Sequence, residues 1–360
     1  MSERMLDNAE IRRAFPHLAQ NVYLNTASAG LSWVGQGDAA AEFYRHKMGG
    51  ITQHDDWINR AEDTRNLLGK LLGVPAGRIW FTGSTTEALN LIALAMPLAP
   101  GDSVALAEDE FASVVAPWMT LQRSGVRLNR IPVKNESDRT SALCAAVNAS
   151  TRVLAVSHVH WRTGTRVDLD ALSTVCDKYE CRLIVDGVQA AGAVAVDAGC
   201  SDAYCASVFK WLLSGFGLGF MVLSDRLSAE LTPALRGYSN VPPSRSLRYG
   251  HQNYPGIYAL HATLQYLETL GWSEIYSQVD RLTARLSVSL RERGFDLVTP
   301  HDARAGIISI RHPAVAQLVA ALAAESISVE DGTPFLRVSP HFYNTDEDVD
   351  RFIRVLTRDS

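Results

Sequence analysis

The sequence predicts an α/β protein with a mainly parallel, helix-covered sheet, followed by a smaller α+β domain. Short apolar runs, long enough only for buried strands, alternate with helical segments from about residue 78 to residue 223. Strands joined by helices of these lengths favour a parallel sheet covered on both faces. The alternation stops at a polar, proline-containing linker over residues 237–255, which marks the change of domain.

Composition excludes several classes of protein. With 360 residues, 47% hydrophobic and 20% charged, the chain is long enough for one large globular domain and a smaller one. The net charge of −5 is spread without a basic stripe, so we expect a small-molecule substrate and neither nucleic acid nor membrane as partner. No apolar run approaches the ~18 residues of a membrane span. The charged N-terminus lacks a signal-peptide core, so a cytoplasmic location is expected.

The first two thirds of the chain read as an ordered series of helices and strands. A short helix ends near Pro16, a brief strand follows in residues 21–30, and a helical region covers 38–72 with a break at Gly49 and Gly50. Residues 78–96 form the first strand–turn–helix unit. After it we expect strands in 102–108, 126–133, 152–159, 182–186 and 218–223, and helices in 111–125, 141–148 and 168–180.

The last third has a different order of elements. A long helical region covers residues 256–293 and is broken only at Gly271. Strands are expected in 295–300, 306–312, 326–330 and 335–340, with a helix over 314–325. A final helix follows Asn344, capped by Thr345, with acidic residues in the first turn where the helix dipole favours negative charge.

Two charged residues end the apolar runs at the centre of the chain. Asp186 closes the run Arg182–Asp186, and Lys210 lies just past the next run. The carboxyl ends of strands in open α/β sheets are where ligands bind, so we expect the two side chains to be neighbours there. The hypothesis is a lysine that forms an imine with a cofactor aldehyde, facing a carboxylate that keeps a ring nitrogen protonated. The alternatives are a solvated strand-end carboxylate and a surface lysine.

A turn rich in hydroxyl groups opens the helix after the first large-domain strand. In Gly83-Ser84-Thr85-Thr86-Glu87, backbone N–H groups and hydroxyls converge where a phosphate could be held. The alternative is a capping box of Ser84 with Glu87, which needs no ligand.

Three other features have simpler interpretations. Gly215, Gly217 and Gly219 have GxGxG spacing before a strand, which argues against a dinucleotide-binding turn and for a turn back into that strand. Arg337 suits bidentate capture of a carboxylate, although arginines are common in edge strands. The five cysteines have no CxxC pair, so reduced, buried thiols are expected rather than disulfides or a metal site.

Taken together, these segments resemble the class V aminotransferase family of fold-type I pyridoxal-phosphate (PLP) enzymes, which includes cysteine desulfurases, selenocysteine lyases, kynureninases and isopenicillin N epimerases. The resemblance runs from YLNTASA to RVSPHFYNT. It implies a sheet of the seven-stranded type in a large PLP-binding domain, residues 21–240. Residues 1–20 and 241–360 would form the small domain.

The resemblance also implies roles for individual residues. Lys210 would form the imine with PLP, Asp186 would pair with its ring nitrogen, and Gln189 would contact its phenolic oxygen. The remaining matches are Thr85, Thr86 and Ser207 at the phosphate, Phe111 stacked on the cofactor, Arg337 on the substrate carboxylate, and Asn25 and Ala27 at the mouth of the site. The family is homodimeric with shared active sites, so Arg248–Asn253 would reach into the partner subunit.

Departures from the family pattern bear on the reaction. The segment SISVEDGTPFLR ahead of Arg337 is short and lacks the persulfide-forming cysteine of cysteine desulfurases. Phe111 replaces a histidine that can move protons. His160 and Trp161 stand where Asn, Ser or Thr is usual, and His251 stands where a phosphate-binding threonine is usual. His160 is therefore either a catalytic residue or a buried, hydrogen-bonded imidazole, and the same choice holds for His251.

The sequence thus predicts a PLP-dependent lyase or aminotransferase that acts on a small α-amino acid through an external aldimine and a quinonoid. With no persulfide cysteine, a C–S β-lyase reaction on a cysteine-derived substrate is the first expectation. An aminotransferase or epimerase of the same family is the alternative, and a non-enzymatic ligand-binding α/β protein is the alternative from another class.

Overall fold

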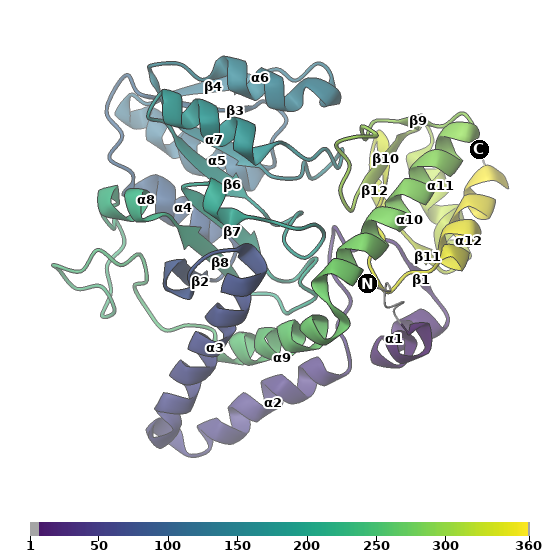
Figure 1. Ribbon diagram of the computed structural model, residues 1–360, viewed down its shortest axis with the longest axis horizontal. Helices are drawn as coiled ribbons and strands as arrows, with labels where there is room; N and C mark the ends of the chain where they lie inside the picture. The colour runs from purple at the N-terminus through teal and green to yellow at the C-terminus, as the bar shows by residue number, and fades with distance from the viewer. Residues whose placement is uncertain (1–6, 359–360) are drawn as a thin grey trace.

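A seven-stranded sheet forms the core of the larger lobe of the structure, a computed structural model that describes residues 7–358 (Figure 1). Its strand order is β2-β8-β7-β6-β5-β3-β4. The strands are β2 Ile79–Thr82, β3 Ser103–Ala107, β4 Arg127–Ile131, β5 Thr151–Ser157, β6 Arg182–Asp186, β7 Ala203–Ser207 and β8 Gly219–Leu223. The predicted seven-stranded sheet is confirmed.

The sheet is parallel except at one strand. Strands β4, β3, β5, β6 and β7 pair in parallel, whereas β8 is antiparallel to both of its neighbours, β7 and β2. A parallel connection needs a crossover of a dozen or more residues, usually a helix. Residues 208–218 between β7 and β8 contain no helix, so the chain turns back and β8 runs the other way.

Helices cover both faces of this sheet (Figure 1). Side chains of β5 alternate between the two sides: Val153 and Ala155 pack on one face, Leu154 and Val156 on the other. The first face is covered by α4 Thr85–Ala95, α5 Ala112–Met119 and α8 Asp225–Glu230, and the second by α3 His54–Leu72, α6 Arg139–Ala146, α7 Leu169–Lys178 and α9 Tyr254–Leu270. Of these, α8 is a helix that the sequence analysis did not predict.

A second, four-stranded antiparallel sheet has the order β12-β13-β10-β9. Leucines every fourth residue of α10, at Leu282, Leu286 and Leu290, pack on it. Thr345 caps α12 as predicted, its Oγ1 accepting from the Asp348 N–H at 3.3 Å. The elements are β9 Asp296–Leu297, β10 Ile308–Arg311, β12 Glu330–Gly332, β13 Phe335–Val338, α10 Trp272–Glu292, α11 Val315–Ala324 and α12 Asp346–Arg358.

The N-terminal segment joins this second sheet region. Helix α1 Asn8–Ala14 precedes β1 Val22–Tyr23, which pairs in parallel with β11 Ile327–Ser328. Helix α2 Gly35–Lys47 then leads to α3 and the large sheet. Residues 25–28 contact both parts of the structure, because Asn25 bridges to Ser339 after β13 and the Ala27 carbonyl accepts from Gln189 after β6.

The division into residues 21–240 and residues 1–20 with 241–360 stays a proposal. Ile257, Leu260 and Leu264 of α9 belong to the core of the large sheet, whereas Val22 and Leu24 pack with the smaller one. Residues 1–6 and 359–360 of the proposed small domain lie outside the described residues. Within residues 7–358, no helix is long and apolar enough to cross a lipid bilayer.

Candidate active site

Asp186 is the last residue of β6 and only 4% of its surface is exposed. Its Oδ1 accepts a hydrogen bond from the Val188 N–H at 2.9 Å. Burial raises the pKa of Asp186 to about 6, although this bond and the charge of Lys210 both oppose the rise. A cationic partner stabilises a buried carboxylate of raised pKa most strongly, because it favours the ionised form that burial disfavours.

Lys210 follows the end of β7, the strand that pairs with β6. Burial lowers the pKa of Lys210 to about 8; Asp186 opposes this shift and the cationic Arg337 adds to it. The two residues that the sequence analysis placed at one sheet edge are thus electrostatic neighbours there. An amine with this pKa is about one tenth unprotonated at pH 7 and about half at pH 8, far more than an ordinary lysine, so it can act as a nucleophile.

The turn between β2 and α4 caps the N-terminus of α4. Ser84 Oγ accepts from the Glu87 N–H at 3.1 Å, and the Glu87 carboxylate accepts from the Gly83 N–H. The capping interpretation of this turn is therefore confirmed.

The same turn also presents free hydroxyl hydrogens. The Thr85 N–H donates to Ser207 Oγ at 2.8 Å, the Ser207 N–H donates to Thr85 Oγ1 at 2.7 Å, and the two hydroxyl oxygens lie 3.0 Å apart. Only one hydroxyl hydrogen can lie between the two oxygens, so the other is available to an anion at the helix N-terminus. A side chain at Gly219 would meet the Ser84 backbone at 3.0 Å, so glycine permits this close approach.

Thr86 and Phe111 lie at the neighbouring ends of α4 and α5. Thr86 Oγ1 is 2.7 Å from Ser113 Oγ. Phe111 is 42% exposed and makes an edge contact with Trp161, their ring centroids 5.4 Å apart. An exposed aromatic face held by a second ring is suited to stacking on a flat ligand.

Gln189 is buried and its side chain joins two parts of the site. Its Nε2 donates to the Ala27 carbonyl at 3.0 Å, and its Oε1 accepts from the Trp211 indole at 2.8 Å. One amide N–H remains available. Gln189 therefore fixes the N-terminal turn against the segment that carries Lys210.

Arg337 in β13 has a buried guanidinium with unused hydrogen-bonding capacity. Nη1 donates to the Trp161 carbonyl at 2.8 Å, and Nη2 donates to Ser28 Oγ at 2.5 Å. Nε is buried and has no partner. Since a buried donor without a partner is costly, the group is suited to receive a carboxylate.

Asn25 contributes to the same corner through Glu330 of β12. Its Nδ2 donates to Glu330 Oε2 at 3.0 Å, and Ser28 Oγ lies 2.6 Å from the same oxygen. Asn25, Ser28 and Arg337 are thus brought together from the two ends of the chain.

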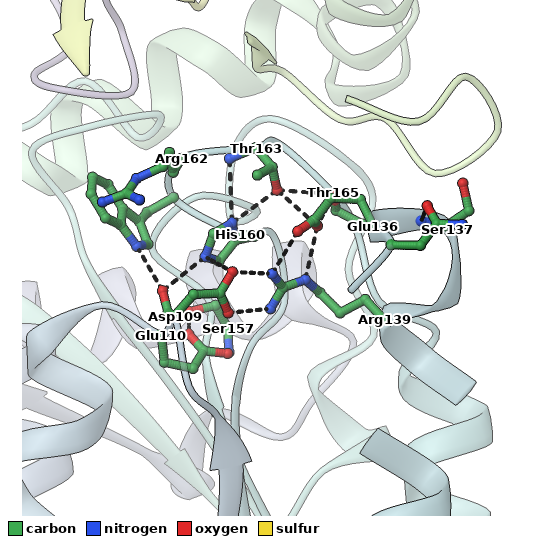
Figure 2. A network of polar contacts seen from close by, with 12 residues as sticks. Asp109, Glu110, Glu136, Ser137, Arg139, Ser157, His160, Arg162, Thr163 and Thr165 are labelled. Atoms are coloured by element: carbon green, nitrogen blue, oxygen red, sulfur yellow. Dashed lines mark hydrogen bonds and ion pairs between the residues drawn. The ribbon is translucent and has the colours of Figure 1, made fainter. Parts of the chain in front are cut away.

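His160 lies in a buried polar network with both ring nitrogens bonded to protein atoms (Figure 2). Nε2 is 3.1 Å from the Asp109 carbonyl, which can only accept, so Nε2 carries the hydrogen. Nδ1 accepts from Thr163, whose Oγ1 is 2.8 Å away. Burial and the charge of Arg139 lower the pKa of His160. These bonds favour a neutral, positioning histidine, and a catalytic role for His160 stays a prediction.

Arg139 holds the acidic side chains of this network. It is 1% exposed and pairs with Asp109 at 2.6 Å and Glu136 at 2.9 Å (Figure 2). Ligand atoms of Asp109, Glu136 and His160 all lie within 4.8 Å of one another, a spacing that a metal ion could use. The Arg139 guanidinium already gives each carboxylate a hydrogen-bonded cationic partner, so a metal ion would have to compete with it.

His251 lies near the β2–α4 turn of its own chain. It packs on Tyr238 with ring centroids 5.0 Å apart, and the nearby Tyr249 hydroxyl donates to Glu87 at 2.8 Å. His251 and Glu87 line the same 210 Å³ cavity. The predicted contact of His251 with the phosphate of a partner subunit stays a prediction.

Sequence reasoning missed Glu330 and the Arg139 network. Glu330 could have been found by counting outward from the Thr333-Pro334 turn, since the hairpin register pairs Glu330 with Arg337. Arg139 had no such signal. Its partners are Asp109, in the loop after β3, and Glu136, three residues before it.

Comparison with known proteins places this geometry in a family. The profile of the aminotransferase class-V family matches residues 37–352. The chain belongs to this family. A cysteine desulfurase of Salmonella gallinarum is 27% identical over 97% of each chain.

Solved structures of other proteins share this fold. A cysteine desulfurase from Thermococcus onnurineus superposes with a TM-score of 0.90 at 23% identity, covering 99% of this chain and 98% of its own. The cystine C–S lyase C-DES, in complex with its product cysteine persulfide, gives a TM-score of 0.87 at 21% identity, covering 95% and 99%. The fold-type I prediction is confirmed.

As a class V enzyme the protein uses PLP, the cofactor to which glycine is covalently linked in a C-DES variant. The residues present fit it. A buried carboxylate, an amine of lowered pKa and free hydroxyl hydrogens at a helix N-terminus lie around one sheet edge. The donor Arg337 Nε lacks a partner, as expected for a group that awaits a substrate carboxylate.

Proposed function

We propose that this PLP enzyme is a C–S β-lyase acting on a small cysteine-derived amino acid without a persulfide cysteine. The observation that carries the proposal is the β11–β13 segment, residues 326–337. It contains no thiol, and it places Glu330 beside Arg337. Cys205 is the partner of Asp186 in the sheet, but its pKa is raised well above the usual value by complete burial, so it is a poor nucleophile.

Three side chains would carry the reaction. When bound, PLP supplies an electron sink for the carbon that loses its proton. Lys210 would hold the cofactor covalently and then, as a free amine, take the substrate α-proton on Nζ. The Asp186 carboxylate would hold the proton on the ring nitrogen. Arg337 would bind and orient the substrate carboxylate through Nε and Nη2.

The other predicted contacts support this arrangement. Thr85, Thr86 and Ser207 would bind the phosphate, with one hydroxyl hydrogen of the Thr85–Ser207 pair free to donate. Phe111 would stack on the cofactor ring, and Gln189 would donate its remaining N–H to the phenolic oxygen. Asn25 and Ala27 would form the mouth of the site, and His160 would hold Trp161 and the Asp109 loop in place.

A homodimer is part of the proposal. Several large apolar side chains are exposed near the site and just past the end of α2, among them Phe216 at 72%, Tyr238 at 64% and Met48 at 86%. Exposed apolar surface of this kind is typical of association surfaces. Sedimentation of the purified protein should give twice the chain mass. The expected cytoplasmic location stays a prediction.

The test is product analysis with the PLP-loaded protein. L-Cysteine, L-cystine and S-alkyl-L-cysteines are supplied, and pyruvate, ammonia and the released thiol or sulfide are measured. The proposal expects pyruvate with at least one S-substituted substrate. Formation of a keto acid that keeps the sulfur would instead indicate aminotransfer, and formation of the D-amino acid would indicate epimerisation.

A further inference from the structure

Glu330 and Arg337 face each other across the β12–β13 hairpin at the proposed substrate site. They are register partners, and Glu330 Oε2 lies 3.9 Å from Arg337 Nη2. Ser28 links them, because its Oγ accepts from Nη2 and lies 2.6 Å from Oε2. The Glu330 side chain is 38% exposed, so it can be reached from solvent.

Glu330 is an anion in this setting. Burial raises its pKa, but the hydrogen bonds from Ser28 and Asn25 and the charge of Arg337 outweigh burial, so the pKa is lowered overall. The negative charge of Glu330 also acts on Lys210, where it partly opposes the lowering of the lysine pKa by burial. The proposed site therefore has a fixed negative charge beside the arginine that would bind the α-carboxylate.

This charge has opposite effects on two kinds of substrate. An α-carboxylate on Arg337 Nε and Nη2 would lie close to the Glu330 carboxylate and be repelled by it. A substrate with a second cationic group could donate that group to Glu330, which removes the repulsion and adds a charge-assisted hydrogen bond. The Glu330 carboxylate therefore penalises neutral side chains and favours cationic ones.

Resting on the lyase function proposed above, we propose that Glu330 is the specificity-determining residue of this site and selects cysteine-derived amino acids whose sulfur substituent carries an ammonium group. The hairpin β12–β13 presents the carboxylate, and Asn25 and Ser28 fix its orientation. Arg337 would then bind the carboxylate of a substrate, and Glu330 would bind the distal ammonium group of the same substrate.

The test uses two substrates of matched size, S-(2-aminoethyl)-L-cysteine and S-propyl-L-cysteine, which differ by an ammonium in place of a methyl group. Their dissociation constants are measured with PLP-loaded wild type by titration of the visible absorbance of the cofactor. We expect the aminoethyl compound to bind at least about tenfold more tightly, the scale of a charge-assisted hydrogen bond. Equal affinities in wild type would overturn the proposal before any variant is made.

The variant Glu330→Gln keeps an acceptor for Ser28 and Asn25 and removes the charge. It should weaken binding of the aminoethyl compound and tighten binding of the propyl compound, so that the preference disappears, while Glu330→Asp should keep part of it. Glu325→Gln, at the exposed C-terminal end of α11, is the matched charge control and should change neither constant. An equal loss for both compounds in Glu330→Gln would mean that Glu330 only supports the turn, which contradicts the proposal.

The absorbance is read within the first turnover, before pyruvate accumulates, so the binding measurement is separate from the chemical step. Pyruvate is assayed in parallel, so a protein that binds both compounds with the expected preference but forms no pyruvate would refute the lyase function and leave the role of Glu330 intact. Conversely, pyruvate from both compounds without a binding preference would support the lyase function and refute the role of Glu330.

Discussion

At the scale of single residues, the site is built on two groups whose charges are disfavoured by burial. Asp186 and Lys210 each have a pKa shifted toward the neutral form, to about 6 and about 8. A bound cation at Asp186 and an imine at Lys210 would remove both penalties. Burial of these two charged groups therefore destabilises the folded protein without cofactor, and bound cofactor removes this destabilisation.

Asp186→Asn tests this cost. The folded-state pKa of Asp186 is raised above its model-peptide value of 3.8, so its ionisation opposes folding from about pH 4 upward and fully above about pH 6. Cofactor-free Asp186→Asn should be more stable than wild type at pH 7.5, by up to about 3 kcal/mol, and no more stable at pH 4. Urea unfolding at both pH values measures this; an advantage that is the same at pH 4 would contradict the assignment.

The pH dependence of cofactor uptake tests Lys210. Its lowered pKa of about 8 means that the free amine forms over the range where an ordinary lysine is still protonated. The rate at which cofactor-free protein gains the visible absorbance of bound PLP should rise with pH and level off above a midpoint near 8. A midpoint near 10 would show that burial does not perturb this amine. Lys210→Ala should lack the reaction and serves as the control.

At the scale of elements, the N-terminus of α4 has two separable tasks. Ser84 caps the helix and Ser207 approaches from β7, so each task belongs to a different side chain. Ser84→Ala should cost about 1 kcal/mol of unfolding free energy with little effect on cofactor affinity. Ser207→Ala also removes the acceptor of the buried Thr85 N–H, so it should cost about 1–3 kcal/mol of unfolding free energy and, in addition, raise the dissociation constant of PLP by about tenfold. If Ser84→Ala proved the more harmful to PLP binding, the phosphate assignment would be wrong.

The loops before α6 and after β5 depend on Arg139. Burial raises the pKa of Glu136, but Arg139 outweighs it and holds the pKa at about 2. The ionised carboxylate therefore stabilises the fold above about pH 4.5, and this contribution is lost as the pH falls toward 2. Arg139→Met should cost about 3 kcal/mol, because it leaves the partly buried Glu136 and Asp109 carboxylates without a counter-charge. Thermal unfolding of Arg139→Met with Glu136→Gln should show partial recovery, and no recovery would exclude this cause.

At the scale of the whole molecule, the sequence predicts those features of the fold and the site that depend on local patterns of apolar residues. Asp186 ends one continuous apolar run and Lys210 follows another, and adjacent parallel strands end at the same edge, so their meeting follows from periodicity. The direction of β8 and the position of Glu330 depend on pairing partners, which single-strand patterns do not encode. Within the Arg139 network only the Glu136–Arg139 pair is local in sequence; the links to Asp109 and to Thr165 join loops that are far apart, and sequence spacing does not predict them.

The central claim is that the chemistry starts at Lys210, past the end of β7, and the attachment point of the cofactor tests it most directly. The PLP-loaded protein is reduced with borohydride, which fixes an imine as a stable amine, then digested and mapped by mass spectrometry. The account predicts the reduced cofactor on the peptide that contains Lys210. A cofactor found instead on Lys47, Lys70, Lys134 or Lys178, or on no lysine, would contradict it.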